Sequence, residues 1–192
     1  MNQIQTAANQ LLTSLFTTES VKKVSLTLER LSSNTSFKKH AYEIASDENL
    51  STGQKGRQFA SLLTKVEVVE LVDFFEQLFK NGELWMFDSQ TFDHFDDFSQ
   101  AFQLAVDQTT IVHFVTAIDL PPLELKQIGQ YFSEVLNKHA LLNHHVNKEI
   151  GGGAQVRIEN LIFDYSLKAR LKRFEKKWID SLVSTSTLVS VN

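Results

Sequence analysis

The spacing of apolar residues changes near residue 107, from a helical period to a strand period. Before that point apolar residues recur every three or four positions, which is typical of amphipathic helices. The pattern predicts six helices, at about residues 6–16, 18–31, 36–45, 54–63, 66–80 and 89–106. Thr18 and Ser36 are the expected N-caps of the second and third helices, because short hydroxyl side chains favour that position.

The last two of these helices carry the largest apolar side chains. The fifth, at 66–80, is apolar around most of its circumference, so we expect it to be the buried centre of a helical bundle. Its β-branched start, VEVVELV, would also suit a strand. The sixth places Phe92, Phe95, Phe98 and Phe102 on one stripe. That stripe predicts a phenylalanine-rich core, with a ligand pocket between aromatic helices as the alternative.

The second half of the chain has the pattern β-α-β-β-α. Residues 110–118 are a continuous β-branched and aromatic run, which predicts a strand covered on both faces. A helix begins at Pro121-Pro122, a strand spans 140–146, and a hairpin joins 154–158 to 161–165. Glu159-Asn160 is the expected two-residue turn, because Asn tolerates a positive φ. The sequence therefore predicts an α+β fold: an N-terminal six-helix bundle (1–107), a small β-α-β-β-α domain (108–183) and a flexible tail (184–192).

The last predicted helix begins at Ser166 and is amphipathic. Its apolar stripe steps by four, three, four and four residues, and we expect this stripe to face the domain core; it comprises Leu167, Leu171, Phe174, Trp178 and Leu182. The opposite face is basic, with Lys168, Arg170, Lys172, Arg173, Lys176 and Lys177.

Three consecutive glycines, Gly151, Gly152 and Gly153, follow Ile150 and precede the hairpin. Glycine takes left-handed backbone angles without steric cost, so the triplet predicts a hinge with Gly152 at positive φ. It does not predict a phosphate cradle, because a dinucleotide-binding glycine motif lies between a strand and the start of a helix, whereas a strand follows here.

The run from Val146 to Phe174 resembles the signature near the C-terminus of the δ subunit of F-type ATP synthases, called OSCP in mitochondria. That signature has a polar residue, an aliphatic residue, a glycine pair, two short strands with an acidic residue in the second, and a helix rich in Arg and Leu. The matching residues here are Asn147, Ile150, Gly151, Gly152, Val156, Arg157, Ile158 and Asp164, followed by SLKARLKRF, and Gly153 extends the glycine pair to a triplet. The first helix, TAANQLLTSLF, matches the family only loosely and lacks its Tyr.

The resemblance implies a non-catalytic stator subunit in the peripheral stalk of an F1Fo ATP synthase, without a cofactor or a metal. The N-terminal bundle would bind the N-terminal segments of the α subunits, and the C-terminal domain would bind the b subunits. Arg170, Arg173 and Lys177 are then the expected partner-binding residues. The protein would be peripheral to the cytoplasmic face of a bacterial inner membrane.

Charge supports an interaction role more than nucleic-acid binding. The 192 residues carry a net charge of −4 with a pI near 5.9, whereas nucleic-acid binders are normally basic. Residues 65–107 hold ten acidic side chains and two basic ones, the reverse of the last helix. We interpret these segments as faces for two different partners, with ordinary solvated surfaces as the alternative.

Motifs for catalysis are absent from the sequence. It has no Gly-x-Ser-x-Gly, no P-loop, no His-Glu-x-x-His and no cysteine. His144 and His145 are adjacent in a strand and point to opposite faces, so with His139 they make a poor metal site. His94 and Asp97 suit an exposed i, i+3 pair. Without a secretory or transit signal, a cytoplasmic protein is the simplest interpretation. The remaining alternative is a small-ligand sensor with a helical bundle and a βαββα regulatory domain.

Overall fold

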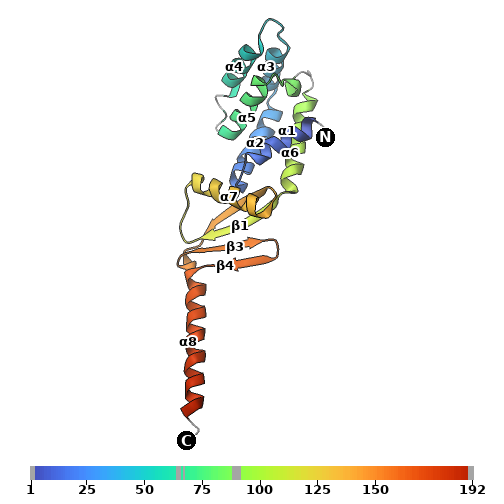
Figure 1. Ribbon diagram of the computed structural model, residues 1–192. Helices are drawn as coiled ribbons and strands as arrows, with labels where there is room; N and C mark the ends of the chain where they lie inside the picture. The colour runs from blue at the N-terminus through green and yellow to red at the C-terminus, as the bar shows by residue number, and fades with distance from the viewer. Residues whose placement is uncertain (1–2, 64–65, 67, 88–91, 190–192) are drawn as a thin grey trace. The chain divides into compact units, whose positions relative to one another are not determined.

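The computed structural model describes residues 3–63, 66, 68–87 and 92–189, with side chains through residue 180. The chain divides into two compact units, Met1–Thr109 and Thr110–Asn192. The first is helical and the second combines helices with a four-stranded sheet, which confirms the α+β class (Figure 1). The division lies two residues after the predicted one.

The helical unit contains α1 (Gln3–Thr13), α2 (Thr18–Ser33), α3 (Thr35–Ser46), α4 (Thr52–Leu62), α5 (Val69–Lys80), the short 3₁₀ helix η2 (Trp85–Phe87) and α6 (Asp93–Asp107). Two predicted caps are wrong by one or two residues. Thr17 caps α2 by accepting from Ser20 N (3.1 Å), and Asn34 caps α3 by accepting from Phe37 N (3.0 Å). Both capping residues have extended backbone angles, which an N-cap requires.

Helix α5 is amphipathic, so the prediction that it is buried nearly all round is wrong. It begins at Val69, which is 65% exposed, so the β-branched residues Val66 and Val68 precede the helix. Its buried face holds Leu71, Phe74, Phe75, Leu78 and Phe79. The start of the predicted sixth helix falls partly on residues 88–91, outside the described residues. Phe92 precedes α6 with left-handed backbone angles.

The predicted phenylalanine-rich core is confirmed. Phe92, Phe95, Phe98 and Phe102 are all buried, together with aromatic side chains from α3, α4, α5 and η2. The Phe59 ring lies 4.1 Å from Phe79 and 4.5 Å from Phe87, measured between ring centroids. Such packing combines large buried area with favourable tilted ring geometry. Helices α3 to α6 therefore share one continuous aromatic core.

The second unit is built on β1 (Thr110–Thr116), β2 (Ala140–Val146), β3 (Ala154–Ile158) and β4 (Leu161–Asp164). The strand order is β2-β1-β3-β4, with β1 and β2 parallel and the other neighbours antiparallel. Helix α7 (Pro122–Leu136) makes the crossover between β1 and β2. The remaining elements are η3 (Lys148–Ile150) and α8 (Leu167–Val189).

Strand β1 is covered on one face, not on both as predicted. Val112 and Phe114 belong to a core on which Leu125, Ile128 and Phe132 of α7 pack. The alternate positions Ile111, His113 and Val115 are exposed or half-buried. A single helix crosses this sheet, so the residues on the other face are not packed in the same core.

Two further details correct the sequence interpretation. The turn between β3 and β4 places Glu159, not Asn160, at positive φ (52°). Helix α8 continues to Val189, so the predicted tail is helical up to that residue, and residues 190–192 lie outside the described residues. Neither Gly nor Pro interrupts the chain after Ser184, so no residue forces an earlier end. Among the described residues, no helix is long and apolar enough to cross a membrane.

Candidate partner-binding surfaces

The apolar stripe of α8 is exposed, which overturns the expectation that it faces the core. Leu171, Phe174 and Trp178 are 59%, 65% and 61% exposed, and Leu167 is also exposed. The side chain of Leu182 lies outside the described residues. The main packing contact of α8 is with η3, and Figure 1 shows the helix leaving the sheet after β4. A contiguous aromatic and aliphatic stripe on a helix surface marks an interaction site.

A row of cations runs beside this stripe. Arg170, Arg173 and Lys177 each precede a stripe residue by one position and are exposed. One position corresponds to about 100° around a helix, so the cation row and the stripe face neighbouring directions. Lys168 and Lys172 follow stripe residues by one position and flank the other side. The helix thus presents an apolar stripe between basic edges.

Arg173 differs from the other two predicted partner-binding residues because it has contacts within the chain. Its guanidinium donates to the Asp164 carbonyl oxygen (3.2 Å) and to Ala169 O (3.3 Å). It therefore lies across the end of β4 while remaining exposed. Arg170 and Lys177 stay the better candidates for a partner.

The start of α8 is fixed by Asp164 and Ser166. Asp164 accepts from Ser166 N (2.9 Å) and from Gln155 Nε2 (3.0 Å), and the buried Ser166 hydroxyl accepts from Ala169 N (3.1 Å). Hydrogen bonds from Ser166 are the main reason that the pKa of the Asp164 carboxyl lies below its usual value. The acidic residue of the signature thus sets the direction in which α8 leaves the sheet.

The glycine triplet packs against the same corner. Gly151, Gly152 and Gly153 have φ of 72°, 142° and 74°. The predicted positive φ at Gly152 is confirmed. A side chain at Gly153 would overlap the carbonyl oxygen of Tyr165, whereas one at Gly152 would meet Leu167 at ordinary contact distance. The triplet therefore forms a corner of positive-φ backbone beside the buried Ile150, and its role as a hinge stays a prediction. The tightest of the three positions, Gly153, has no signal of its own in the local sequence.

Arg157, the remaining signature residue, lies away from α8. It is exposed on β3 and pairs in register with His113 of β1. The structure thus divides the signature into the corner that orients α8 and the sheet face that bears Arg157.

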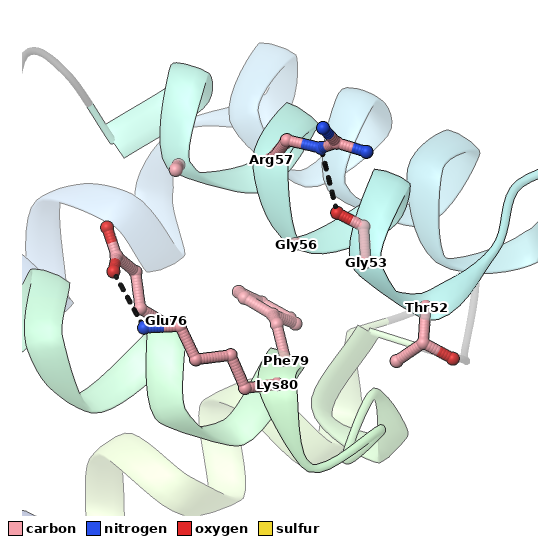
Figure 2. A pocket seen from close by; sticks show the side chains of 8 residues that line it. Thr52, Gly53, Gly56, Arg57, Glu76, Phe79 and Lys80 are labelled. Atoms are coloured by element: carbon pink, nitrogen blue, oxygen red, sulfur yellow. Dashed lines mark hydrogen bonds and ion pairs between the residues drawn. The ribbon is translucent and has the colours of Figure 1, made fainter.

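The helical unit has a pocket of about 160 Å³ between α4 and α5. Gly53, Gly56 and Ala60 leave space along α4, and Phe79 of α5 lies beneath it. Figure 2 shows Arg57 on one side and the Glu76–Lys80 ion pair (3.6 Å) on the other. The pocket is apolar with a charged rim. None of the residues that line it is a histidine, and none of the predicted site residues lines it.

His94 lies on α6, whereas His144 and His145 lie on β2. His94 Nδ1 lies 3.2 Å from Trp85 O, so a backbone carbonyl is one of its neighbours, and its pairing with Asp97 stays a prediction. His144 Nε2 and the Thr116 hydroxyl form a hydrogen bond (2.7 Å), while His145 points to the opposite sheet face. Within the described ranges no three His, Cys, Asp or Glu side chains are grouped to hold a metal ion.

The family model described as ATP synthase delta (OSCP) subunit matches residues 8–177. The chain belongs to this family. The resemblance based on the glycine triplet, the hairpin and α8 is therefore confirmed.

A curated relative is the ATP synthase subunit delta of Alkalihalophilus pseudofirmus OF4, 35% identical over 88 residues. The match covers 45% of this chain and 48% of the relative, so the chain spans about half the length of the curated relative. A chain of the Toxoplasma gondii mitochondrial ATP synthase hexamer is 14% identical, over 93% of this chain and 98% of that one, with a TM-score of 0.43. At that TM-score no conclusion rests on the structural likeness.

Proposed function

We propose that this delta (OSCP) family member is a non-catalytic stator subunit in the peripheral stalk of an F-type ATP synthase. The observation that carries the proposal is the exposed apolar stripe of α8 between its basic edges. Leaving aromatic side chains in water costs free energy that a bound helix would recover. A long amphipathic helix with acidic residues beside an apolar seam is the partner that fits.

In this proposal the two parts of the chain bind different partners. A β-α-β-β-α domain (108–183) binds the b subunits through α8, and a six-helix N-terminal bundle (1–107) binds the N-terminal segments of the α subunits. The pocket between α4 and α5 offers that bundle an apolar hole with Arg57 and Lys80 on its rim. A partner side chain of matching size and an acidic neighbour would suit it.

The function proposed is mechanical. A stator resists the torque of a rotor by staying bound at both ends, and no covalent bond changes. Helix α8 has 23 residues, which corresponds to about 34 Å at 1.5 Å per residue. Its start is held by Asp164, Ser166 and the glycine corner, so force on the helix passes into the sheet. The chain would lie at the cytoplasmic face of a bacterial inner membrane, attached through the complex.

The test is rebinding of the full chain to membranes from which this subunit has been removed, followed by proton-driven ATP synthesis. Wild-type chain should restore both. Trp178→Ala with Leu171→Ala should fail to restore them while unfolding at the wild-type temperature, because these side chains are exposed. The matched control is Leu104→Ala with Leu26→Ala, which removes exposed apolar side chains from the helical unit. Stabilisation by a small metabolite, without rebinding, would instead support the ligand-sensor alternative.

A further inference from the structure

The sheet face opposite α7 gathers polar and basic groups in two neighbouring rows. In one row Asn143, His113 and Arg157 lie side by side on β2, β1 and β3. In the next row His145 lies beside Val115 and Gln155. All are on the face away from the α7 core, since they alternate with Val112, Phe114 and Val156.

Charge on this face is unbalanced. At the strand positions, all of which the structure describes, Asp164 is the one carboxylate on this face, and its oxygens accept from Ser166 and Gln155. Arg157 and His145 are exposed, and within the described residues no carboxylate pairs with Arg157. Two histidines and an arginine therefore share one face with no acid free to neutralise them.

Spacing on the sheet sets what could neutralise them. Neighbouring strands lie about 4.8 Å apart, and alternate residues along a strand lie about 6.7 Å apart. His113 and Arg157 are therefore about 4.8 Å apart. His145 lies on β2 opposite Val115, so it is about 8 Å from His113 and about 12 Å from Arg157. Carboxylates one or two turns apart on a helix, about 5–6 Å or about 11 Å, span these separations. Val115 and Ile162 border the cations and give the site an apolar edge.

Asn143 is a side-chain neighbour of the His113 ring. Its Nδ2 lies 3.4 Å from His113 Nδ1, where an amide N–H can donate to the unprotonated ring nitrogen. Rotation of the Asn143 amide would let its oxygen accept from Nδ1–H once the ring is protonated. His113 can therefore take up a proton without losing this neighbour.

We propose that His113, His145 and Arg157 form a second docking site, for a partner segment that presents two carboxylates. The partner is an acidic helical segment of another subunit of the same complex, so this inference rests on the proposed function. The site is separate from α8 and would hold the sheet itself against that segment. Arg157 binds one carboxylate through its planar guanidinium, and the histidines bind the other.

Binding at this site should depend on pH. Burial is the main cause that lowers the pKa of His113 in the free chain, and the neighbouring charges of Arg157 and His145 lower it further. The groups that face His113 are thus basic, with Asn143 the neutral neighbour. A bound carboxylate reverses this balance and raises the pKa of His113 in the complex. Affinity is then greatest below the free pKa and falls as pH rises through the bound-state pKa.

The experiment uses the full chain and membranes stripped of this subunit. Wild-type chain should rebind more tightly at about pH 6 than at about pH 8. Each proton taken up on binding changes the affinity by at most about tenfold per pH unit. Arg157→Gln should weaken rebinding at both values. His113→Gln with His145→Gln should remove the pH dependence. His40→Gln is the matched control, because it removes an exposed histidine from α3 of the helical unit.

Direct contact is tested with Arg157→Lys. A carbodiimide joins a lysine amine to a carboxylate in contact with it, with loss of water, so the new lysine should form an amide with an acidic residue of the partner. Peptide mass spectrometry then identifies that residue. Normal rebinding by wild type, with no amide from Arg157→Lys and a wild-type pH profile for the double histidine variant, would overturn the second site alone. Failure of wild-type chain to rebind would overturn the proposed function and this inference together.

Discussion

Helices α6 and α8 have the same apolar spacing and opposite surroundings. The α6 stripe, Phe95, Phe98 and Phe102, is at most 1% exposed, whereas the α8 stripe is mostly in solvent. Both are amphipathic by sequence, and the difference lies in what packs on them. Helix α6 contacts α1, α2 and η2, while η3 at its base is the main contact of α8. Periodicity identifies an apolar face, but the neighbouring elements decide whether that face is a core or a binding site.

The largest expected effect is on the free energy of unfolding, when the same substitution of Phe by Ala is made in each of the two helices. Phe95→Ala should lower the free energy of unfolding by about 3–5 kcal/mol, since it leaves a cavity among aromatic rings. Phe174→Ala should change it by less than about 0.5 kcal/mol, because its ring is exposed, yet weaken rebinding to membranes. Thermal and urea unfolding of both variants measure the contrast. Equal destabilisation by the two would mean that the α8 stripe is packed after all.

The glycine corner is the next largest effect. Gly153→Ala should cost about 1–3 kcal/mol for the left-handed backbone alone, and more because the added carbon overlaps Tyr165 O. Gly152→Val should cost more than about 1 kcal/mol, because a β-branched side chain is strained at positive φ. Gly151→Asn should be mildest, since Asn tolerates this backbone region. Urea unfolding gives the order, and an equal, small effect at all three positions would favour a flexible hinge.

Most helices and strands could be predicted from the sequence because their signals are local. The hairpin, the two central strands, the phenylalanine core and the family signature all depend on short-range period or on adjacent residues. The prediction for α5 was wrong because Val66 and Val68 were counted in the helix. The prediction for β1 was wrong because a run of apolar residues does not reveal that one helix alone covers the sheet. The domain boundary and the partner residues stay predictions.

The candidate surfaces were less predictable, for a physical reason. Whether Leu171 and Trp178 are buried depends on tertiary contacts that spacing does not encode. The steric demand at Gly153 comes from Tyr165, twelve residues away, and the pairing of His113 with Arg157 depends on strand register. The basic residues of α8 had a local signal, but Arg173 proved to be bonded to Asp164 O.

A smaller effect is the pH dependence of the stability of the sheet unit. Burial lowers the pKa of His144 below its ordinary value, against an opposing effect of Asp119 and with a further lowering by His145. The unfolded chain therefore takes up this proton first as pH falls. Stability is full above about pH 6.5 and is lost as pH falls toward the folded pKa, by at most about 1.4 kcal/mol per pH unit.

Urea unfolding at several pH values measures this loss, and His144→Gln should reduce the pH dependence. His40→Gln, in the helical unit, is the control that should leave it unchanged. A steeper loss in the His144→Gln variant than in wild type would mean that another group is responsible.

The smallest effect on stability, and the one most specific to binding, concerns the cation row of α8. Arg170→Glu with Lys177→Glu should leave the free energy of unfolding within about 0.5 kcal/mol of wild type, since both side chains are exposed. Adding Arg173→Glu should cost slightly more, because its bond to Asp164 O is lost. Both variants should rebind membranes more weakly than wild type at low salt. The difference should shrink as salt rises, because exposed charges are screened over about 10 Å at 0.1 M.

The matched control for the cation row is Lys126→Glu with Lys148→Glu, which makes the same change in net charge at exposed positions of α7 and η3. If only the α8 variants lose binding, the row acts locally beside the apolar stripe. Equal loss in the control would mean that overall charge, and not the position of Arg170 and Lys177, steers association. Normal rebinding by the α8 variants at every salt concentration would leave the apolar stripe as the whole of the α8 contact, because the cations would then be ordinary solvated side chains.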